Sequence, residues 1–294
     1  MSSLSNLLIH DKTLLQARAF LRRPTHALLI SGPAGSGKAH LAYSLAAELL
    51  NIEIDELTRY PYFAILQRPE GKQDIPIDSV RTLSSSLKLK VPASGEVKRV
   101  TLIESAQDLN EESSNALLKI IEEPSPGNIF ILTTDNPKSL LPTITSRAQQ
   151  LQVFPLSLDQ MQLYLDGKYS LSKIENAWML SQGGAGLMLA LLNNQDDHPL
   201  KQSIDSAKKY LSQDKYQRAI TSDALSKDKQ QLKVFLDALT KLLAALYRSS
   251  VDRGNMRQQK RLLSSRKLVN KLSGMLDGNA SPKLIALELS LNLL

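Results

Sequence analysis

Short apolar runs alternate with helical patterns along the first half of the chain. Three runs, at residues 27–30, 100–103 and 129–133, have the length of buried parallel strands. The first run leads into a glycine-rich turn, and residues 38–50 then follow a helical period. Four apolar residues share one face of that helix: Ala42, Leu45, Ala46 and Leu49.

The segment after the second run is also predicted to be helical. Asp108 and Glu111 have the spacing of a capping box, and Pro124 is expected to end the helix. Its apolar face holds Leu117, Ile120 and Ile121. Repeated strand–helix alternation predicts an α/β domain, with a parallel sheet and helices on both of its faces.

The pattern changes after Pro155, where the spacings become helical and no clear strand follows. The polar stretch 193–199 breaks the helical pattern, and residues 278–282 break it again before a final apolar helix over 283–294. Residues 232–246 are strongly apolar on one side. We therefore expect three domains: an α/β domain over 1–156, a small helical domain over 157–205 and a helical bundle over 206–294.

Composition excludes several kinds of site. The chain has 294 residues, of which 42% are apolar and 22% charged, as in ordinary globular proteins. It contains no cysteine, which rules out disulfides, cysteine-bound zinc and thiol nucleophiles, and its four histidines are scattered. No window of 18 apolar residues predicts a membrane-spanning helix, and the N-terminus lacks the layout of a signal peptide. We expect a cytoplasmic protein without a membrane partner.

The net charge of +7 comes from one region. Residues 248–271 hold eight basic residues opposed only by Asp252. Such a stretch is either a solvated helix face or a surface for nucleic acid or an acidic partner. It contains no aromatic residue that could stack on bases, which weakens the single-strand alternative. The basic residues are Arg248, Arg253, Arg257, Lys260, Arg261, Arg266, Lys267 and Lys271.

The turn after the first strand has the sequence of a phosphate-binding loop. GPAGSGK, with Gly32, Gly35, Gly37 and Lys38, fits the G-x-x-x-x-G-K pattern, in which backbone N–H groups and the lysine hold phosphates. The Mg²⁺-binding Ser or Thr that should follow is Ala39, whose methyl group cannot bind a metal. ATP or ADP binding is possible here, with Mg²⁺ weak or absent, and the role of the next residue, His40, stays open.

The second strand gives a similar result. It ends in Glu104 and Ser105, where a phosphate-loop ATPase usually has a metal-binding Asp followed by a catalytic Glu. Glu104 is either a poor metal ligand or an ordinary carboxylate at a strand end. Ser105 cannot act as a carboxylate base, and a positioned general base contributes about 10²–10⁴-fold in rate. Little hydrolysis is therefore expected.

Three stretches resemble one family. RRPTHALLISGPAGSGK, NALLKIIEEPSPGNIFILTTDNPKSLLPTITSRAQQ and PEGKQDIPIDSVRTL are similar to segments of bacterial AAA+ clamp-loader subunits, most closely the delta-prime group of DNA polymerase III. The match covers most of residues 15–155, and the tail from 279 resembles the family's collar less specifically. This resemblance implies an α/β P-loop AAA+ domain, a helical lid and an all-α collar that oligomerises.

The resemblance also implies roles for individual residues. Arg147, after Ser146, matches the family's arginine finger, which reaches a nucleotide on the neighbouring subunit; the alternative is a structural arginine paired with a local carboxylate. Thr134 falls in the sensor 1 region, where it either contacts a phosphate or only ends a strand. The sensor 2 arginine is absent from 183–186, and the four-cysteine zinc module is absent from 51–75, so neither zinc nor another metal is expected.

Together these features predict a clamp-loader subunit that lends Arg147 to a neighbour and does not hydrolyse ATP alone, as part of a DNA polymerase holoenzyme. The partners implied by the resemblance are the delta and gamma/tau subunits in a hetero-pentamer, the sliding clamp and primed DNA. Two alternatives stay open: an active gamma-type ATPase that uses Glu104, and a nucleic-acid-binding module that uses residues 248–271.

Overall fold

The chain divides into two compact units, Met1–Leu156 and Ser157–Leu294. The computed structural model describes residues 4, 7–72, 74–89, 96–193, 195, 198–278 and 280–293. The first predicted domain boundary coincides with the division after Leu156. The second, between 205 and 206, falls inside one continuous helix, α9 (Pro199–Ser212), so a boundary at that position would cut the helix.

Some predicted features lie outside the described residues. The two predicted breaks in the second unit include four such residues: Asn194, Asp196, Asp197 and Asn279. The predicted final helix includes one more, Leu294.

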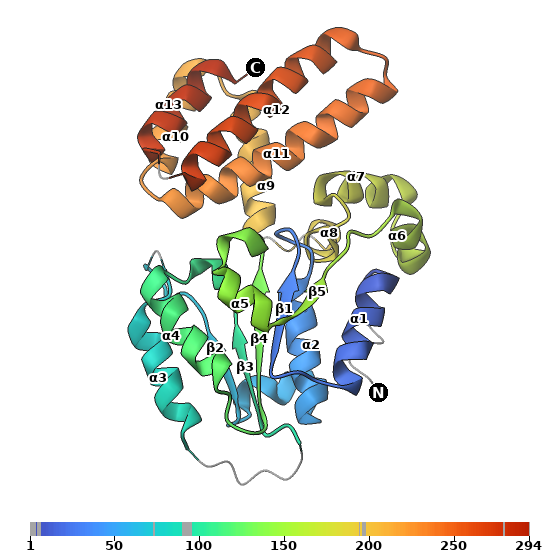
Figure 1. Ribbon diagram of the computed structural model, residues 1–294. Helices are drawn as coiled ribbons and strands as arrows, with labels where there is room; N and C mark the ends of the chain where they lie inside the picture. Colours follow the sequence, from blue (N-terminus) through green and yellow to red (C-terminus); the bar gives the residue numbers. More distant parts are fainter. Residues whose placement is uncertain are drawn as a thin grey trace. The chain divides into compact units, whose positions relative to one another are not determined.

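The first unit is built on a parallel five-stranded sheet with the order β2-β3-β4-β1-β5 (Figure 1). Its strands are β1 (Ala27–Ser31), β2 (Phe63–Leu66), β3 (Arg99–Ile103), β4 (Asn128–Thr134) and β5 (Gln149–Gln152). The three predicted strands are confirmed as β1, β3 and β4, which lie beside one another in the sheet. Their carboxyl ends therefore meet at one edge, where ligands bind in open α/β sheets.

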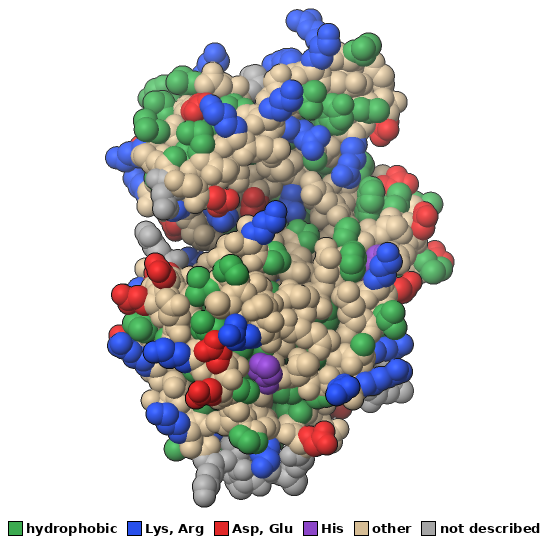
Figure 2. All heavy atoms as spheres, viewed as in Figure 1, with side chains coloured by type: hydrophobic (Ala, Val, Ile, Leu, Met, Phe, Trp, Pro, Cys, Tyr) green, Lys and Arg blue, Asp and Glu red, His purple; other side chains and the backbone are tan. Residues whose placement is uncertain are grey.

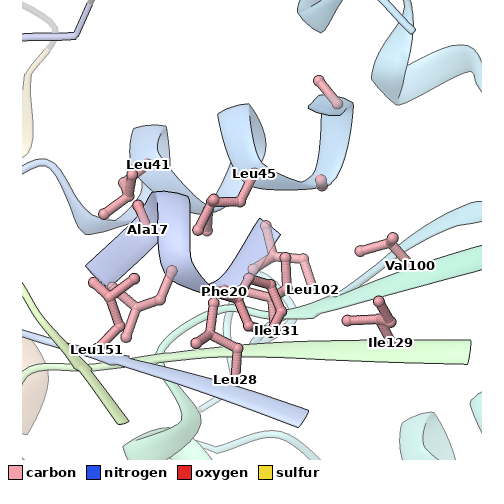
Figure 3. Close-up of a cluster of buried hydrophobic side chains, with 14 of the residues drawn as sticks. Ala17, Phe20, Leu28, Leu41, Leu45, Val100, Leu102, Ile129, Ile131 and Leu151 are labelled. Atoms are coloured by element: carbon pink, nitrogen blue, oxygen red, sulfur yellow. The ribbon is translucent and has the colours of Figure 1, made fainter. Parts of the chain in front are cut away.

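Helices cover both faces of this sheet, as predicted. α1 (Asp11–Arg22) and α2 (Lys38–Leu50) pack on one face. In Figure 3, Phe20 of α1 and Leu45 of α2 meet Leu28 and Leu102 of the strands, and all four are fully buried. The other face holds α3 (Ile77–Leu87), α4 (Glu111–Glu122) and α5 (Pro142–Arg147). Short 3₁₀ turns lie at Ile54–Arg59, Ala106–Asp108 and Pro137–Ser139.

The predicted capping box of α4 is wrong. Asn110, two residues after Asp108, caps this helix by accepting a hydrogen bond from the Ser113 N–H, 2.9 Å away. Asp108 instead closes a 3₁₀ turn, and its carboxylate lies 3.5 Å from Arg68. Both side chains suit an N-cap position, so local spacing alone could not decide between them. The end of the helix before Pro124 is confirmed.

The described part of the second unit contains helices and no strand, as predicted. They are α6 (Leu158–Leu165), α7 (Leu171–Ser181), α8 (Ala185–Leu192), α9, α10 (Lys215–Leu225), α11 (Lys229–Asp252), α12 (Met256–Asp277) and α13 (Pro282–Asn292). The apolar side predicted for residues 232–246 forms part of this unit's core. No helix in the described part of either unit is long and apolar enough to span a membrane.

Arg218 ties the last helix of the chain to α9 and α10. Its side chain is buried, and its guanidinium donates to three backbone carbonyls: Tyr210 at 3.1 Å, Leu211 at 2.8 Å and Leu293 at 2.7 Å. It also lies over the Tyr210 ring, with 5.7 Å to the ring centroid. A buried charge is costly unless it is hydrogen-bonded, so these bonds fix the end of α13 against the bundle.

Candidate functional site

The glycine-rich turn joins β1 to α2 at the carboxyl edge of the sheet. Gly35 (φ 81°) and Gly37 (φ 93°) adopt left-handed backbone conformations that side chains disfavour. Gly32 is needed for space, since a Cβ there would lie 3.0 Å from both Ser36 Oγ and Val153 Cβ. Each predicted glycine thus has a local physical reason to be there.

Ser36 lies buried in this loop, with only 4% of the residue's surface exposed. Its hydroxyl has no hydrogen-bond partner among the described residues. Buried polar groups are nearly always hydrogen-bonded. The first N–H groups of α2, which begins at Lys38, also have no partners within the helix. The loop therefore fits an anionic group such as a phosphate.

Lys38 forms an ion pair with Asp135, the first residue after β4, and also donates to the Pro33 carbonyl at 3.2 Å. The lysine side chain is mostly buried, whereas 44% of the Asp135 side chain is exposed. Asp135 thus neutralises the positive charge of Lys38, the side chain predicted to bind a phosphate. A bound phosphate would have to compete with this carboxylate.

The positions that would hold Mg²⁺ in a phosphate-loop ATPase are altered at two points. Ala39 offers no hydroxyl. Tyr43, four residues later on the same side of α2, is hydrogen-bonded to Glu104. Burial, together with the charge and hydrogen bond of Glu104, raises the pKa of Tyr43 to about 12. Tyr43 also packs against Phe63, with 5.9 Å between ring centroids. Glu104 is therefore engaged by a neighbour, and this set of residues does not fit a magnesium ion.

The predicted base and sensor positions make local contacts. Ser105 has a left-handed conformation (φ 52°), and its N–H donates to Thr133 Oγ1 at 3.0 Å. Thr134 is fully buried, and its hydroxyl donates to the Asn136 carbonyl and accepts from the Asn136 N–H, both at 3.2 Å. The contact of Thr134 with a phosphate stays a prediction.

Arg147 ends α5 at the surface of the first unit. Its Nη2 lies 2.8 Å from Glu122 Oε1 of α4, and its Nη1 donates to the Thr143 carbonyl at 3.1 Å. Both members of the ion pair keep 39% of their side-chain surface exposed. Glu122 is thus a local carboxylate partner of the kind that the structural alternative for Arg147 requires. The guanidinium nevertheless stays accessible to solvent.

Tyr43 and Asp135 are the site residues that sequence reasoning missed. The position of Tyr43 one turn after Ala39 was a possible signal, because residues four apart share a helix face. Asp135 stood within the sensor segment but had no assigned role. His40 is exposed on α2, and its carbonyl accepts a hydrogen bond from Ser44. Within the described ranges, no three His, Asp or Glu side chains form a possible metal site.

The basic stretch of the second unit spans the end of α11 and most of α12. Arg248 lies over the ring of Trp178 with 5.5 Å to its centroid, and Arg266 lies over Tyr247 at 5.6 Å. Lys271 pairs with Glu288 of α13 at 3.0 Å. Three of the eight cations are thus used in contacts within the unit.

The chain is similar to known subunits of DNA polymerase III. The chain is 32% identical to the DNA polymerase III subunit delta′ of Pseudomonas aeruginosa over 208 residues, which cover 64% of this chain and 62% of that protein. It is 28% identical to the Escherichia coli K12 subunit delta′ over 190 residues, covering 59% and 56% of the two chains. The match thus spans little more than half the length of these relatives.

A second group of relatives has another name. The chain is 32% identical to the E. coli K12 DNA polymerase III subunit tau over 170 residues, which cover 53% of this chain and 26% of that protein. The crystal structure of a DNA polymerase III gamma subunit-related protein from Thermotoga maritima has a TM-score of 0.56 at 16% identity, covering 95% and 97% of the two chains. That likeness concerns the fold.

The first unit also matches a family model. The model described as "DNA polymerase III, delta subunit" covers residues 10–157, which is half of the chain. This range includes the glycine-rich loop between β1 and α2, the Glu104 strand and Arg147. The relatives named delta′ agree with this match, and the chain belongs to the DNA polymerase III delta-subunit family.

Proposed function

We propose that the protein is a delta-prime-type clamp-loader subunit that does not hydrolyse ATP alone and lends Arg147 to a neighbouring ATPase. The observation that supports this most strongly is the Tyr43–Glu104 contact beside Ala39. The hydroxyl that would bind Mg²⁺ is absent at Ala39, and Glu104 is hydrogen-bonded to Tyr43, while Arg147 stays exposed. In this proposal the protein works in a hetero-pentamer that loads the sliding clamp onto primed DNA.

The expected loss of hydrolysis follows from what is missing. Ala39 removes one metal ligand, Tyr43 engages the carboxylate that would help to hold the metal, and Ser105 replaces the base. Removing a general base alone costs about 10²–10⁴-fold in rate. We expect phosphate release by the purified chain to stay at the background level and to be the same in Lys38→Ala. Turnover that is lost in Lys38→Ala would overturn this part of the proposal.

Nucleotide binding without turnover is compatible with the loop. The glycines and the buried Ser36 hydroxyl suit a phosphate, but Lys38 must leave Asp135 to reach it. Calorimetric titration with ADP should therefore give tighter binding to Asp135→Asn than to the parent chain, with little change when Mg²⁺ is left out. Lys38→Ala should weaken binding. Tighter binding to the parent chain than to Asp135→Asn would contradict the proposed competition.

Arg147 is proposed to act in trans. A guanidinium that neutralises charge on a transferred phosphoryl group contributes about 10³–10⁵-fold to kcat. To reach a neighbour's nucleotide, Arg147 must exchange its contact with Glu122 for the phosphate. Arg147 and Glu122 are both partly exposed, and exposed ion pairs contribute only about 0–1 kcal/mol. The exchange therefore costs little.

The test uses a complex reconstituted with a catalytically active clamp-loader subunit. Arg147→Ala should reduce ATP turnover at the adjoining site by about 10³-fold or more, while the complex still assembles. Arg81→Ala is the matched control, because Arg81 is also an exposed arginine of the first unit and pairs with Asp78 at 3.1 Å. Equal turnover in the two variants would refute the role of Arg147.

An apolar face on α13 and α10 is proposed as the collar contact. Leu284, Leu287 and Leu291 recur at one side of α13 and are 67%, 52% and 58% exposed. On α10, which packs against α13, Tyr216 and Ile220 are 73% and 51% exposed. Figure 2 shows hydrophobic side chains gathered over these two helices. Leu287→Glu should reduce assembly with other subunits without unfolding the bundle, as measured by gel filtration and circular dichroism.

The similarity to tau subunits favours one alternative, an active gamma-type ATPase that uses Glu104 as a metal ligand. In that case Mg²⁺ must displace Tyr43 from Glu104. Magnesium-dependent phosphate release by the chain alone would support this alternative, and Glu104→Gln would then abolish the activity. The phosphate-release assay of the purified chain thus distinguishes the two functions.

A further inference from the structure

The second unit contains a pocket of about 640 Å³ that the proposed function does not use. Three leucines from α9, α11 and α12 form its apolar floor: Leu211, Leu246 and Leu262. Leu262 is buried in the core of the unit, and Leu211 and Leu246 pack against that core. Two exposed arginines of α12, Arg257 and Arg261, also line the pocket. The site thus combines an apolar floor with a basic rim.

The two arginines of the rim lie one helical turn apart, so their side chains share a face of α12. Within the described part of the chain, neither has a hydrogen bond or an ion pair, and no carboxylate lines the pocket. Other cations of the unit are used internally: Arg218 donates to three carbonyls, and Lys271 pairs with Glu288. The rim therefore has two guanidinium groups available for an anionic ligand.

A second hollow adjoins the first. It measures about 290 Å³ and is lined by Lys260, Ser264 and Asn292, together with Arg261. Because Arg261 lines both hollows, they are neighbours on α12. The buried Arg218 also lines the first pocket, and the second hollow adds Lys260 to the two arginines of the rim. The combined surface suits an extended segment better than a single small ion.

We propose that this surface, which lies outside the phosphate-loop site, binds an acidic protein segment that carries an apolar side chain. Carboxylates pair with guanidinium groups through two parallel hydrogen bonds, a geometry that Arg provides and Lys does not. An apolar side chain of the same segment would cover the leucine floor, and removing both apolar surfaces from water favours binding.

Nucleic acid fits this surface less well. A phosphate backbone would use the arginines but has no apolar group for the three leucines. Among the described residues, no aromatic side chain lines either hollow, so bases would have nothing to stack on. The charge and the apolar floor together favour an acidic peptide over DNA.

The proposal is tested with the full chain and a labelled acidic peptide, Glu-Asp-Leu-Glu-Asp-Phe, by fluorescence anisotropy. Binding should weaken at least tenfold in Arg257→Glu/Arg261→Glu, because two paired charges become repulsive. Lys267→Glu, which changes an exposed cation of α12 that does not line the pocket, should leave the affinity within about twofold. Circular dichroism would show that both variants remain folded.

Changing the ligand tests both halves of the site without changing the protein. A peptide with Asn and Gln in place of the acids, and one with Ser in place of Leu and Phe, should each bind at least tenfold more weakly. Equal binding of these peptides, or an equal loss in Lys267→Glu, would overturn the proposal. It would also fail if a single-stranded oligonucleotide bound more tightly than the acidic peptide and only oligonucleotide binding depended on Arg257 and Arg261.

Discussion

The buried guanidinium of Arg218 should be a major source of stability for the second unit. Arg218→Met keeps most of the aliphatic volume but removes three hydrogen bonds to carbonyls. The Tyr210 carbonyl keeps a second partner, the Gln213 N–H at 3.2 Å, whereas Leu211 and Leu293 lose the bond from the guanidinium. We therefore count two weakened carbonyls rather than three.

The expected loss follows from these two groups. A buried polar group left without its partner costs about 1–3 kcal/mol, which gives a total of about 2–4 kcal/mol after allowing for incomplete additivity. With a urea slope of about 2 kcal/mol per molar, the midpoint of unfolding should fall by about 1–2 M. Arg218→Lys should lie between the parent and Met, since one ammonium group cannot reach three carbonyls equally well.

The single tryptophan makes the assay specific for the second unit, because Trp178 lies on α7. Urea unfolding followed by tryptophan fluorescence therefore reports this unit in the full chain. Lys267→Met is the matched control, because Lys267 is exposed on α12, and its midpoint should stay within about 0.3 M of the parent. A midpoint for Arg218→Met equal to that of the control would refute the reasoning.

Three further predictions concern single positions. Gly274→Ala should raise the fluorescence-detected free energy of unfolding by about 0.5–1 kcal/mol, because Gly274 lies within α12 and, apart from the helix's own backbone and its two chain neighbours, no described atom lies within 4 Å of the added methyl. A decrease would contradict the helical geometry. Gly32→Ala should destabilise the first unit by about 1–3 kcal/mol, measured by circular dichroism, and should weaken ADP binding, because the Cβ of the new alanine would crowd Ser36. Unchanged stability and affinity would count against the packed loop. For Tyr43, an absorbance titration compared with Tyr43→Phe should show one phenol ionising near pH 12. Because the pKa of Tyr43 is raised in the folded protein, the stabilising contact with Glu104 is complete below pH 10, the usual tyrosine pKa, and is lost as the pH rises towards 12. A phenol that ionises near pH 10 would exclude the contact.

The elements that sequence predicted well have strong local signals. α2 begins and ends at the predicted residues because a glycine with positive φ precedes it and its apolar residues keep a helical period. The edge strand β5, Gln149–Gln152, escaped prediction because it has only one apolar residue and a single neighbour in the sheet. Polar edge strands depend on pairing with the rest of the sheet, which local patterning does not encode.

The candidate site was predictable in its loop and less so in its contacts. The spacing of Gly32, Gly37 and Lys38 follows from phosphate-loop chemistry. The pairing of Lys38 with Asp135, and of Tyr43 with Glu104, joins residues that are far apart in the sequence. Their proximity depends on the sheet order, which places β4 and β3 near the loop, and a single sequence read by local pattern does not fix that order.

Asp135 and Arg147 lie on the same short connection between β4 and β5. One pairs with Lys38, the lysine proposed to bind a phosphate in this chain, and the other is the arginine proposed to serve the next subunit. Anything that draws Lys38 away from Asp135 therefore acts on the segment that presents Arg147. In a ring of such subunits, two nucleotide sites would sense each other through residues 135–147 of one chain.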